Sequence, residues 1–181
     1  GANLQSDPAI TSGSNKSLVV WIDSRPLAGI AGQRIYGRFG NSIGYFTDNE
    51  ICISDTAQAA IKGMPKVRIA KSGRALVVWL DKRSGNLQVW GRWLTSAGAL
   101  DGSEFQISNA VSDLKNDELG LSIDTLGRFY AVWLDRNTAA PVVKGHWYNA
   151  DKSNGGTFSW SPSIGVNISD MTIDGLGKGN I

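Results

Sequence analysis

The sequence predicts an all-β fold, a β-propeller of four-stranded blades with three blades in the chain. Three observations support this prediction: one motif occurs three times, its spacing is constant, and short predicted strands alternate with turn signals. The glycines that mark the motif, Gly37, Gly91 and Gly145, lie 54 residues apart in both intervals. A fixed period of this length indicates a repeat architecture, in which each repeat forms one supersecondary unit.

Each copy of the motif has three parts. The first ends in Trp-x-Asp (Trp21 and Asp23, Trp79 and Asp81, Trp133 and Asp135), the second carries the marker glycine, and the third ends in Ile-Ser. The copies predict blade 1 over residues 5–58, blade 2 over 59–113 and blade 3 over 114–170. The tail, residues 171–181, is Gly-rich and only faintly resembles the start of another blade.

The strands of the middle repeat follow from its pattern of apolar and turn-forming residues. Residues 65–69 alternate at period two and predict the first strand, and 71–73 form a turn. Residues 74–80 are apolar on both faces, so we expect the second strand to be buried on both sides. A turn over 81–86, a third strand over 87–94, a loop over 96–103 and a fourth strand over 104–108 complete the repeat. No segment has a helical apolar period, so little helix is expected.

The repeated Trp and Asp have structural interpretations. One Trp per blade is expected to fill the space between stacked sheets, because its side chain buries roughly 150–250 Å². The Asp two residues later begins a turn, where its carboxylate can accept backbone N–H groups.

Three blades do not close a ring, since closed propellers generally have four to eight blades. Two arrangements would cover the exposed end faces. Two copies could associate head to tail into a six-bladed homodimer, or the chain could be part of a longer propeller. We expect the homodimer, with self-association through the end blades.

Composition excludes several classes of function. The net charge is +2 and the basic residues are scattered, which excludes the basic stripe of a nucleic-acid binder. No apolar run approaches the ~18 residues that a membrane span needs, so no membrane insertion is expected. Cys52 lies in an apolar alternation and is interpreted as a core residue. One Cys and one His do not make a zinc site, and Asp151-x-Ser153-x-Gly155 lacks the ligands of a calcium loop, so no metal or cofactor is expected.

The third copy carries seven additional residues within 149–162, between its expected third and fourth strands, the latter near Val166–Ser169. Within them, Ser153 to Phe158 is similar to the second half of the Asp-box of sialidases and related propellers, a Ser-x-Asp-x-Gly-x-Thr-Trp/Phe hairpin. The match is partial, because Asp151 stands where the family has Ser and Ser153 where it has Asp.

The whole repeat, Val-Val-Trp-x-Asp-x-Arg followed by Ile-Tyr-Gly-Arg-Phe and Ile-Ser, resembles the propeller repeats of large bacterial secreted and surface proteins. This resemblance implies an extracellular or cell-surface location. A sialidase-like enzyme would further need an arginine cluster and a tyrosine nucleophile with a glutamate partner. The chain offers residues of these types, although none lies in a matching motif: Arg38, Arg68, Arg74, Arg92, Arg128, Tyr36 and Glu118.

The third strand of each copy suggests a binding site. Its residues alternate in pairs that share one face: Tyr36 and Arg38, Trp90 and Arg92, Lys144 and His146. An aromatic ring beside a cationic donor suits sugar recognition, because the ring stacks on C–H groups and the cation binds hydroxyl or carboxylate oxygens. The alternative is that these pairs pack between blades as cation–π contacts.

We therefore expect a non-catalytic extracellular propeller module that binds glycan or protein ligands through these six residues. Two alternatives stay open: a fragment of a sialidase-like glycoside hydrolase, and a structural repeat spacer of a large surface protein.

Overall fold

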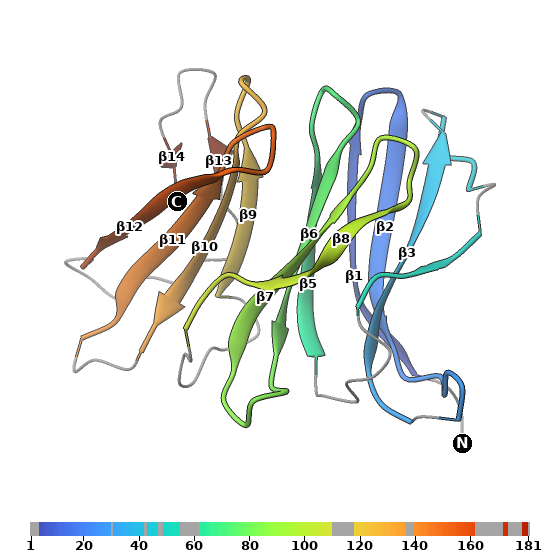
Figure 1. Cartoon of the computed structure of the whole chain (residues 1–181), viewed down its shortest axis with the longest axis horizontal. Helices are drawn as coiled ribbons and strands as arrows, with labels where there is room; N and C mark the ends of the chain where they lie inside the picture. The colour runs from blue at the N-terminus through green and yellow to red at the C-terminus, as the bar shows by residue number, and fades with distance from the viewer. Residues whose placement is uncertain are drawn as a thin grey trace.

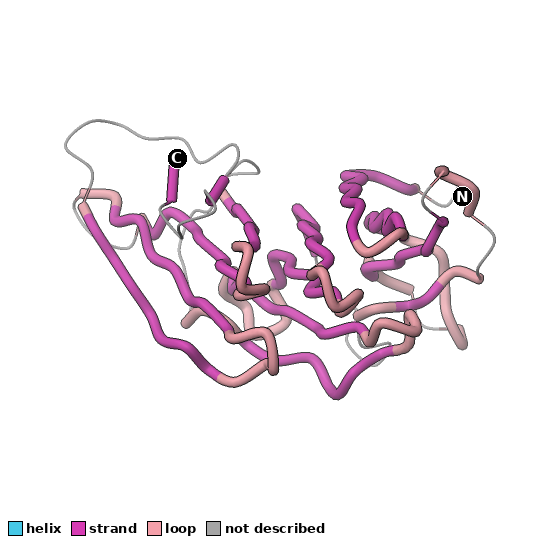
Figure 2. The backbone as a smooth tube through the Cα atoms, turned by 90° about the horizontal axis from the view of Figure 1, so that it is seen from above, coloured by secondary structure: helices cyan, strands magenta, loops and turns pink. Residues whose placement is uncertain are grey.

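The computed structural model describes residues 4–29, 31–41, 43–46, 49–54, 62–109, 118–136, 140–161, 172–173 and 179–180. Most of them belong to three four-stranded antiparallel sheets, and no helix occurs among them. The sheets stand side by side in an arc, one per predicted blade (Figures 1 and 2). The all-β, three-bladed propeller fold predicted from the sequence is thereby confirmed.

The strands of each blade are adjacent in chain order. Blade 1 comprises β1 (Gln5–Gly13), β2 (Lys16–Asp23), β3 (Arg34–Asn41) and β4 (Ile51–Cys52). Blade 2 comprises β5 (Lys62–Ile69), β6 (Ala75–Asp81), β7 (Gln88–Leu94) and β8 (Leu100–Gln106). Blade 3 comprises β9 (Leu119–Ile123), β10 (Phe129–Asp135), β11 (Val142–Tyr148) and β12 (Asn154–Trp160). A further two-stranded sheet pairs β13 (Thr172–Ile173) with β14 (Gly179–Asn180).

The first strands of neighbouring blades approach one another, β1 beside β5 and β5 beside β9. We call β1, β5 and β9 the inner strands. The core lies between the sheets, in one apolar cluster shared by blades 1 and 2 and another shared by blades 2 and 3. All seven residues of β6 are buried, as predicted for the second strand. Trp79 and Trp133 fill the two clusters, whereas Trp21 lies in the end blade and is only half-buried.

The constant spacing of the marker glycines has a steric cause. A Cβ atom on Gly91 would lie 2.9 Å from Cδ1 of Ile107, and one on Gly37 would lie 2.7 Å from Cδ1 of Ile53. Any larger residue would collide with a side chain in the fourth strand or just after it, so each blade needs glycine at this position.

The fourth strand of blade 3 corrects one prediction. The residues interpreted as an insertion contain a tight turn and then β12 itself, which pairs with β11. Phe158 is the cross-strand partner of Gly145, as Phe105 is of Gly91 in blade 2, and its ring fills the space beside the glycine: a Cβ on Gly145 would lie 2.1 Å from it. The segment predicted as this strand, Val166–Ser169, lies outside the described residues.

In blade 2, β8 begins at Leu100, four residues before the predicted start, since Thr95 and Ala99 close a short turn in which Gly98 adopts a φ of 86°.

Candidate functional site

Charged side chains gather at one end of the blades, where the inner strands begin and the second strands end. We call this the charged end. It is organised by the aspartate of the Trp-x-Asp motif and by a nearby arginine. In blades 1 and 2 that arginine is the second residue after the aspartate. The turn after the second strand brings the arginine back onto the carboxylate.

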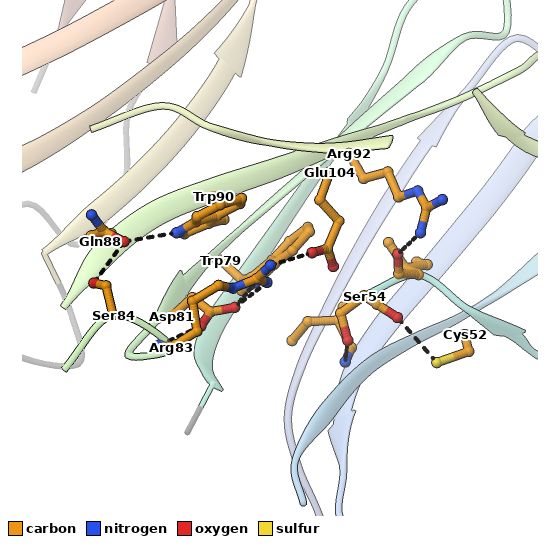
Figure 3. A network of polar contacts seen from close by, with 12 residues as sticks. Cys52, Ser54, Trp79, Asp81, Arg83, Ser84, Gln88, Trp90, Arg92 and Glu104 are labelled. Atoms are coloured by element: carbon orange, nitrogen blue, oxygen red, sulfur yellow. Dashed lines mark hydrogen bonds and ion pairs between the residues drawn. The ribbon is translucent and has the colours of Figure 1, made fainter. Parts of the chain in front are cut away.

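Blade 2 shows the arrangement most completely (Figure 3). The fully buried carboxylate of Asp81 accepts the indole N–H of Trp79 at 3.1 Å and the backbone N–H of Arg83 at 2.9 Å. The Arg83 guanidinium bridges Asp81, at 2.5 Å, and Glu104, at 2.6 Å. Burial disfavours the charged guanidinium, but its hydrogen bonds to the two carboxylates outweigh that effect and raise the pKa of Arg83.

Blade 1 repeats the arrangement with Asp23, Arg25 and Glu50. The backbone N–H of Arg25 donates to Asp23 at 2.8 Å, and its guanidinium reaches Glu50 at 2.6 Å. Burial favours the neutral carboxyl of Asp23, but hydrogen bonds from Arg25, then Gln5 and Trp21, lower its pKa to about 2. The predicted turn role of the aspartate is therefore confirmed in blades 1 and 2.

Blade 3 departs from the pattern. Asp135 pairs with Lys144 at 2.5 Å, and Arg136 pairs with the fully buried Glu118 at the start of the inner strand. Glu118, one of the residues considered for a sialidase-like site, is thus held in an ion pair of this end.

The rings predicted to stack on a sugar are covered by these same arginines. The guanidinium carbon of Arg25 lies 4.6 Å from the centre of the Tyr36 ring, and that of Arg83 lies 4.0 Å from the Trp90 ring. Tyr36 also stacks on Trp21 and is only 5% exposed. The cation–π partners are therefore Arg25 and Arg83, rather than the neighbouring Arg38 and Arg92.

The predicted cationic residues also have structural contacts. Arg92 donates to the carbonyl oxygen of Ile53 in blade 1 at 2.9 Å and to that of Gly102 at 3.1 Å. Lys144 binds Asp135, and His146 lies 2.8 Å from Oδ1 of Asn154 and stacks on the buried Tyr148. Arg38 is half-buried on β3. The six predicted residues thus lie in three separate pairs, one per blade, and their role in ligand binding stays a prediction.

The other cations of the sialidase interpretation are likewise dispersed. Arg68 donates to the carbonyl of Val67, Arg74 to that of Ala150, and Arg128 pairs with Asp124. They do not converge on one pocket.

Two inner strands carry a feature that the sequence analysis missed. The register of β1 shifts between Ser6 and Ala9, and that of β5 shifts between Gly63 and Lys66. At these β-bulges, Asp7 and Met64 adopt φ angles of 49° and 48°, uncommon for residues with a side chain. Each of these two residues precedes a proline, and this shared X-Pro pair is the sequence signal that could have indicated the bulges. Bulges often re-aim a side chain beside a functional site.

The two bulge residues differ in environment. Met64 is buried in the core between blades 2 and 3, whereas Asp7 is exposed. Within the described part of the chain, no ion pair or hydrogen bond holds the Asp7 carboxylate. It is therefore an accessible carboxylate on an inner strand with a constrained backbone.

Open hollows lie on the described part of the chain, and we describe two of them. One, of about 290 Å³, lies beside β1 and β2 against Pro8 and Trp21. The other, of about 410 Å³, lies between the turns of blades 2 and 3, against Lys71 and Leu126.

In the described residues no cluster of His, Cys, Asp and Glu suits a metal ion, and no helix could cross a membrane. Cys52 is half-buried, and burial raises the pKa of its thiol.

The hairpin compared with an Asp-box is a tight turn. Ser153 donates its backbone N–H to Asp151 at 2.9 Å, and Asn149 donates to the Ser153 carbonyl at 3.0 Å. The turn lies at the opposite end from Asp81, and its kinship with the Asp-box stays a prediction.

These sheets define a β-propeller, and comparison with solved structures agrees. No protein-family model and no curated protein sequence matches the chain. An α-L-arabinofuranosidase from Fusarium graminearum, in complex with an iminosugar inhibitor, aligns with 95% of this chain and 49% of its own, at 14% identity and a TM-score of 0.61. A GH93 α-L-arabinofuranosidase of the same organism with arabinobiose aligns with 96% of this chain and 50% of its own, at 13% identity and a TM-score of 0.60.

An endo-arabinase from Bacteroides thetaiotaomicron aligns with 95% of this chain and 67% of its own, at 11% identity and a TM-score of 0.57. The chain thus has the fold of glycoside hydrolase propellers and spans about half the length of the arabinofuranosidase chains it matches.

These matches correct the predicted function. The expected non-catalytic binding module was wrong, because the propellers that resemble this chain are glycoside hydrolases.

Proposed function

We propose that this chain is part of a β-propeller glycoside hydrolase that cleaves arabinose-containing glycans. The observation that supports this most directly is the alignment of nearly the whole chain with about half of an arabinofuranosidase. The endo-arabinase, matched over two thirds of its length, is named for the same sugar. An extracellular or cell-surface location, where such glycans are accessible, is part of the same proposal.

Glycoside hydrolysis commonly uses two carboxyl groups that flank the scissile bond. Most buried acids of the charged end are unsuited to this work, since Asp23, Asp81 and Glu118 are neutralised by arginine. Asp7 is the described carboxylate that best fits, because it is exposed on an inner strand at a β-bulge. We assign it one of the two roles. The second carboxyl group would come from the part of the propeller that this chain does not span.

The test is to assay the whole protein that contains this chain on 4-nitrophenyl α-L-arabinofuranoside and on linear arabinan, with an aryl sialoside as comparison. Arabinose release is expected, without sialic acid release. Replacing Asp7 by Asn should lower kcat by about 10²–10⁴-fold, the usual contribution of a positioned acid or base. Asp151→Asn is the matched control, because Asp151 is an exposed aspartate on a turn at the other end of the blades.

Two outcomes would count against the proposal. Sialic acid release without arabinose release would favour the sialidase-like alternative, and no release from any of the three substrates would remove the hydrolase assignment. If Asp7→Asn releases arabinose as well as the parent protein does, the hydrolase activity is supported and the catalytic role of Asp7 is wrong.

A further inference from the structure

The end of the chain repeats a segment near the start of blade 3. Residues 171–178 (Met-Thr-Ile-Asp-Gly-Leu-Gly-Lys) match residues 121–128 (Leu-Ser-Ile-Asp-Thr-Leu-Gly-Arg) position by position. Four positions are identical and three others are conservative changes. The matching segment in blade 3 contains the end of the inner strand and the turn that leads to the second strand.

The strand pairing repeats as well. In blade 3, Ser122 pairs with Tyr130 and Ile123 with Phe129. In the terminal sheet, Thr172 pairs with Asn180 and Ile173 with Gly179, so every partner is shifted by the same 50 residues. Strand β13 also contacts β9, as β9 contacts β5 and β5 contacts β1. β13 therefore occupies the place of the next inner strand.

Blade 3 presents an apolar face on this side. Val132, Leu134 and Val143 form a buried cluster, with Tyr130 and Phe158 packed against it. Their counterparts one period earlier are Val78, Leu80 and Val89, which pack against blade 3 in the core between blades 2 and 3. Val132, Leu134 and Val143 are fully buried in the present chain, whereas Tyr130 and Phe158 are partly exposed. We call this cluster of five residues of blade 3 the outer face. It corresponds to the side of blade 2 that packs against blade 3.

We infer that the outer face of blade 3 is the docking surface for a fourth blade, and that β13 and β14 are the first two strands of that blade. The inference rests on the repeated register and on continuity with the two interfaces already present, and not on the proposed activity. It also assigns a different occupant from the homodimer expected from the sequence, in which the partner's blade 1 would need the place of β13.

Hydrogen exchange on the intact chain is the first test. If β13 and β14 are blade strands, the peptide containing residues 172–180 should exchange its amides at least as slowly as the β1–β2 hairpin of the other end blade. Complete exchange of this peptide at the rate of an unstructured chain would overturn the inference.

Variants of the docked strand give a second test. Ile173 holds the register position of Ile123, which packs against the core between blades 2 and 3. Ile173→Asp, or deletion of residues 171–181, should lower Tm by about 2–4 °C or more and increase binding of an apolar dye. The control Ile173→Val should leave both unchanged. Equal Tm and dye binding for all these proteins would contradict the inference.

A completed blade offers the third test. Because Ile181 corresponds to Ala131, a copy of residues 132–161 appended after Ile181 supplies the remaining strands. The extended chain should unfold at a higher temperature than the parent, and an unchanged or lower Tm would contradict the inference. Sedimentation tests the competing occupant, a second copy of the chain. Trp21 lies in the end face of blade 1, so Trp21→Glu should dissociate a dimer that forms through this face. If such a dimer is found and residues 172–180 exchange freely, the outer face is covered by a second copy and the inference is wrong.

Discussion

The guanidinium carbon of Arg83 lies 4.0 Å from the centre of the Trp90 ring, while its nitrogens bind the buried carboxylates of Asp81 and Glu104. One side chain thus neutralises two buried acids and covers an aromatic ring. Arg25 has the same three contacts in blade 1, with Asp23, Glu50 and Tyr36. The Trp-x-Asp-x-Arg segment is therefore a stabilising element of the blade, and its arginine is the residue on which the element depends.

Replacing Arg83 by Met should destabilise the protein by about 3–5 kcal/mol, because it removes the guanidinium that pairs with the buried carboxylates of Asp81 and Glu104. Arg25→Met is the matched comparison in blade 1. The Arg25 side chain is 30% exposed, against 12% for Arg83, and the Glu50 side chain is 37% exposed. Water can therefore replace part of the ion-pair interaction that Arg25→Met removes. The Asp23 carboxylate is nevertheless as buried as that of Asp81, so we expect a smaller but clear loss of about 1–3 kcal/mol there. Urea unfolding of both variants measures the difference, and equal losses would contradict the assigned importance of burial.

Stability at acid pH should depend on Asp23. Its pKa is about 2 in the folded protein and near the ordinary value of 3.8 when unfolded, so the ionised carboxylate stabilises the fold above pH 4. That contribution is lost as the pH falls from about 4 to 2. The free energy of unfolding of Asp23→Asn should therefore approach that of the parent protein over this range. A constant difference between the two proteins from pH 6 to pH 2 would show that the carboxylate does not titrate as described.

Replacing Gly91 by Ala should destabilise the protein by about 1–3 kcal/mol, because the added Cβ would lie 2.9 Å from Ile107 in a packed interior. Gly63→Ala is the control, since a Cβ there meets no heavy atom within 4 Å. Combining Gly91→Ala with Ile107→Val, which removes the colliding Cδ1 atom, should recover part of the loss. Thermal unfolding of the three variants tests this, and a control as unstable as Gly91→Ala would argue against the steric cause.

Blades 2 and 3 should be weakly coupled by Asp101. This side chain binds Lys152 at 2.8 Å and lies 3.5 Å from Arg74, which donates to the Ala150 carbonyl in blade 3. A double-mutant cycle of Asp101→Asn and Lys152→Met should give a coupling of about 0.2–1 kcal/mol, because both side chains are partly exposed. Half-molar salt should reduce it. A coupling that is zero at low salt would show that the pair contributes no stability.

The repeat itself was readable from the sequence because it depends on local patterns. The alternation of apolar residues, the turn signals and the 54-residue spacing predicted the three blades, the buried second strand and the role of Asp81 in its turn. Each of these properties involves residues that are close in the chain, and the structure confirms them.

Contacts between distant residues were decided by the tertiary structure. The fourth strand of blade 3 depends on which segment pairs with β11, and there Phe158 lies opposite Gly145. Whether Trp90 is open to a ligand depends on the position of Arg83, seven residues away across a turn. The accessibility of Asp7 depends on a bulge that the pairing of β1 with β2 creates. The sequence by itself thus determined the kind of unit and the number of complete blades, since these follow from periodicity. Which surfaces remain accessible was settled only by packing between strands and between sheets, because burial depends on neighbours that no local pattern encodes.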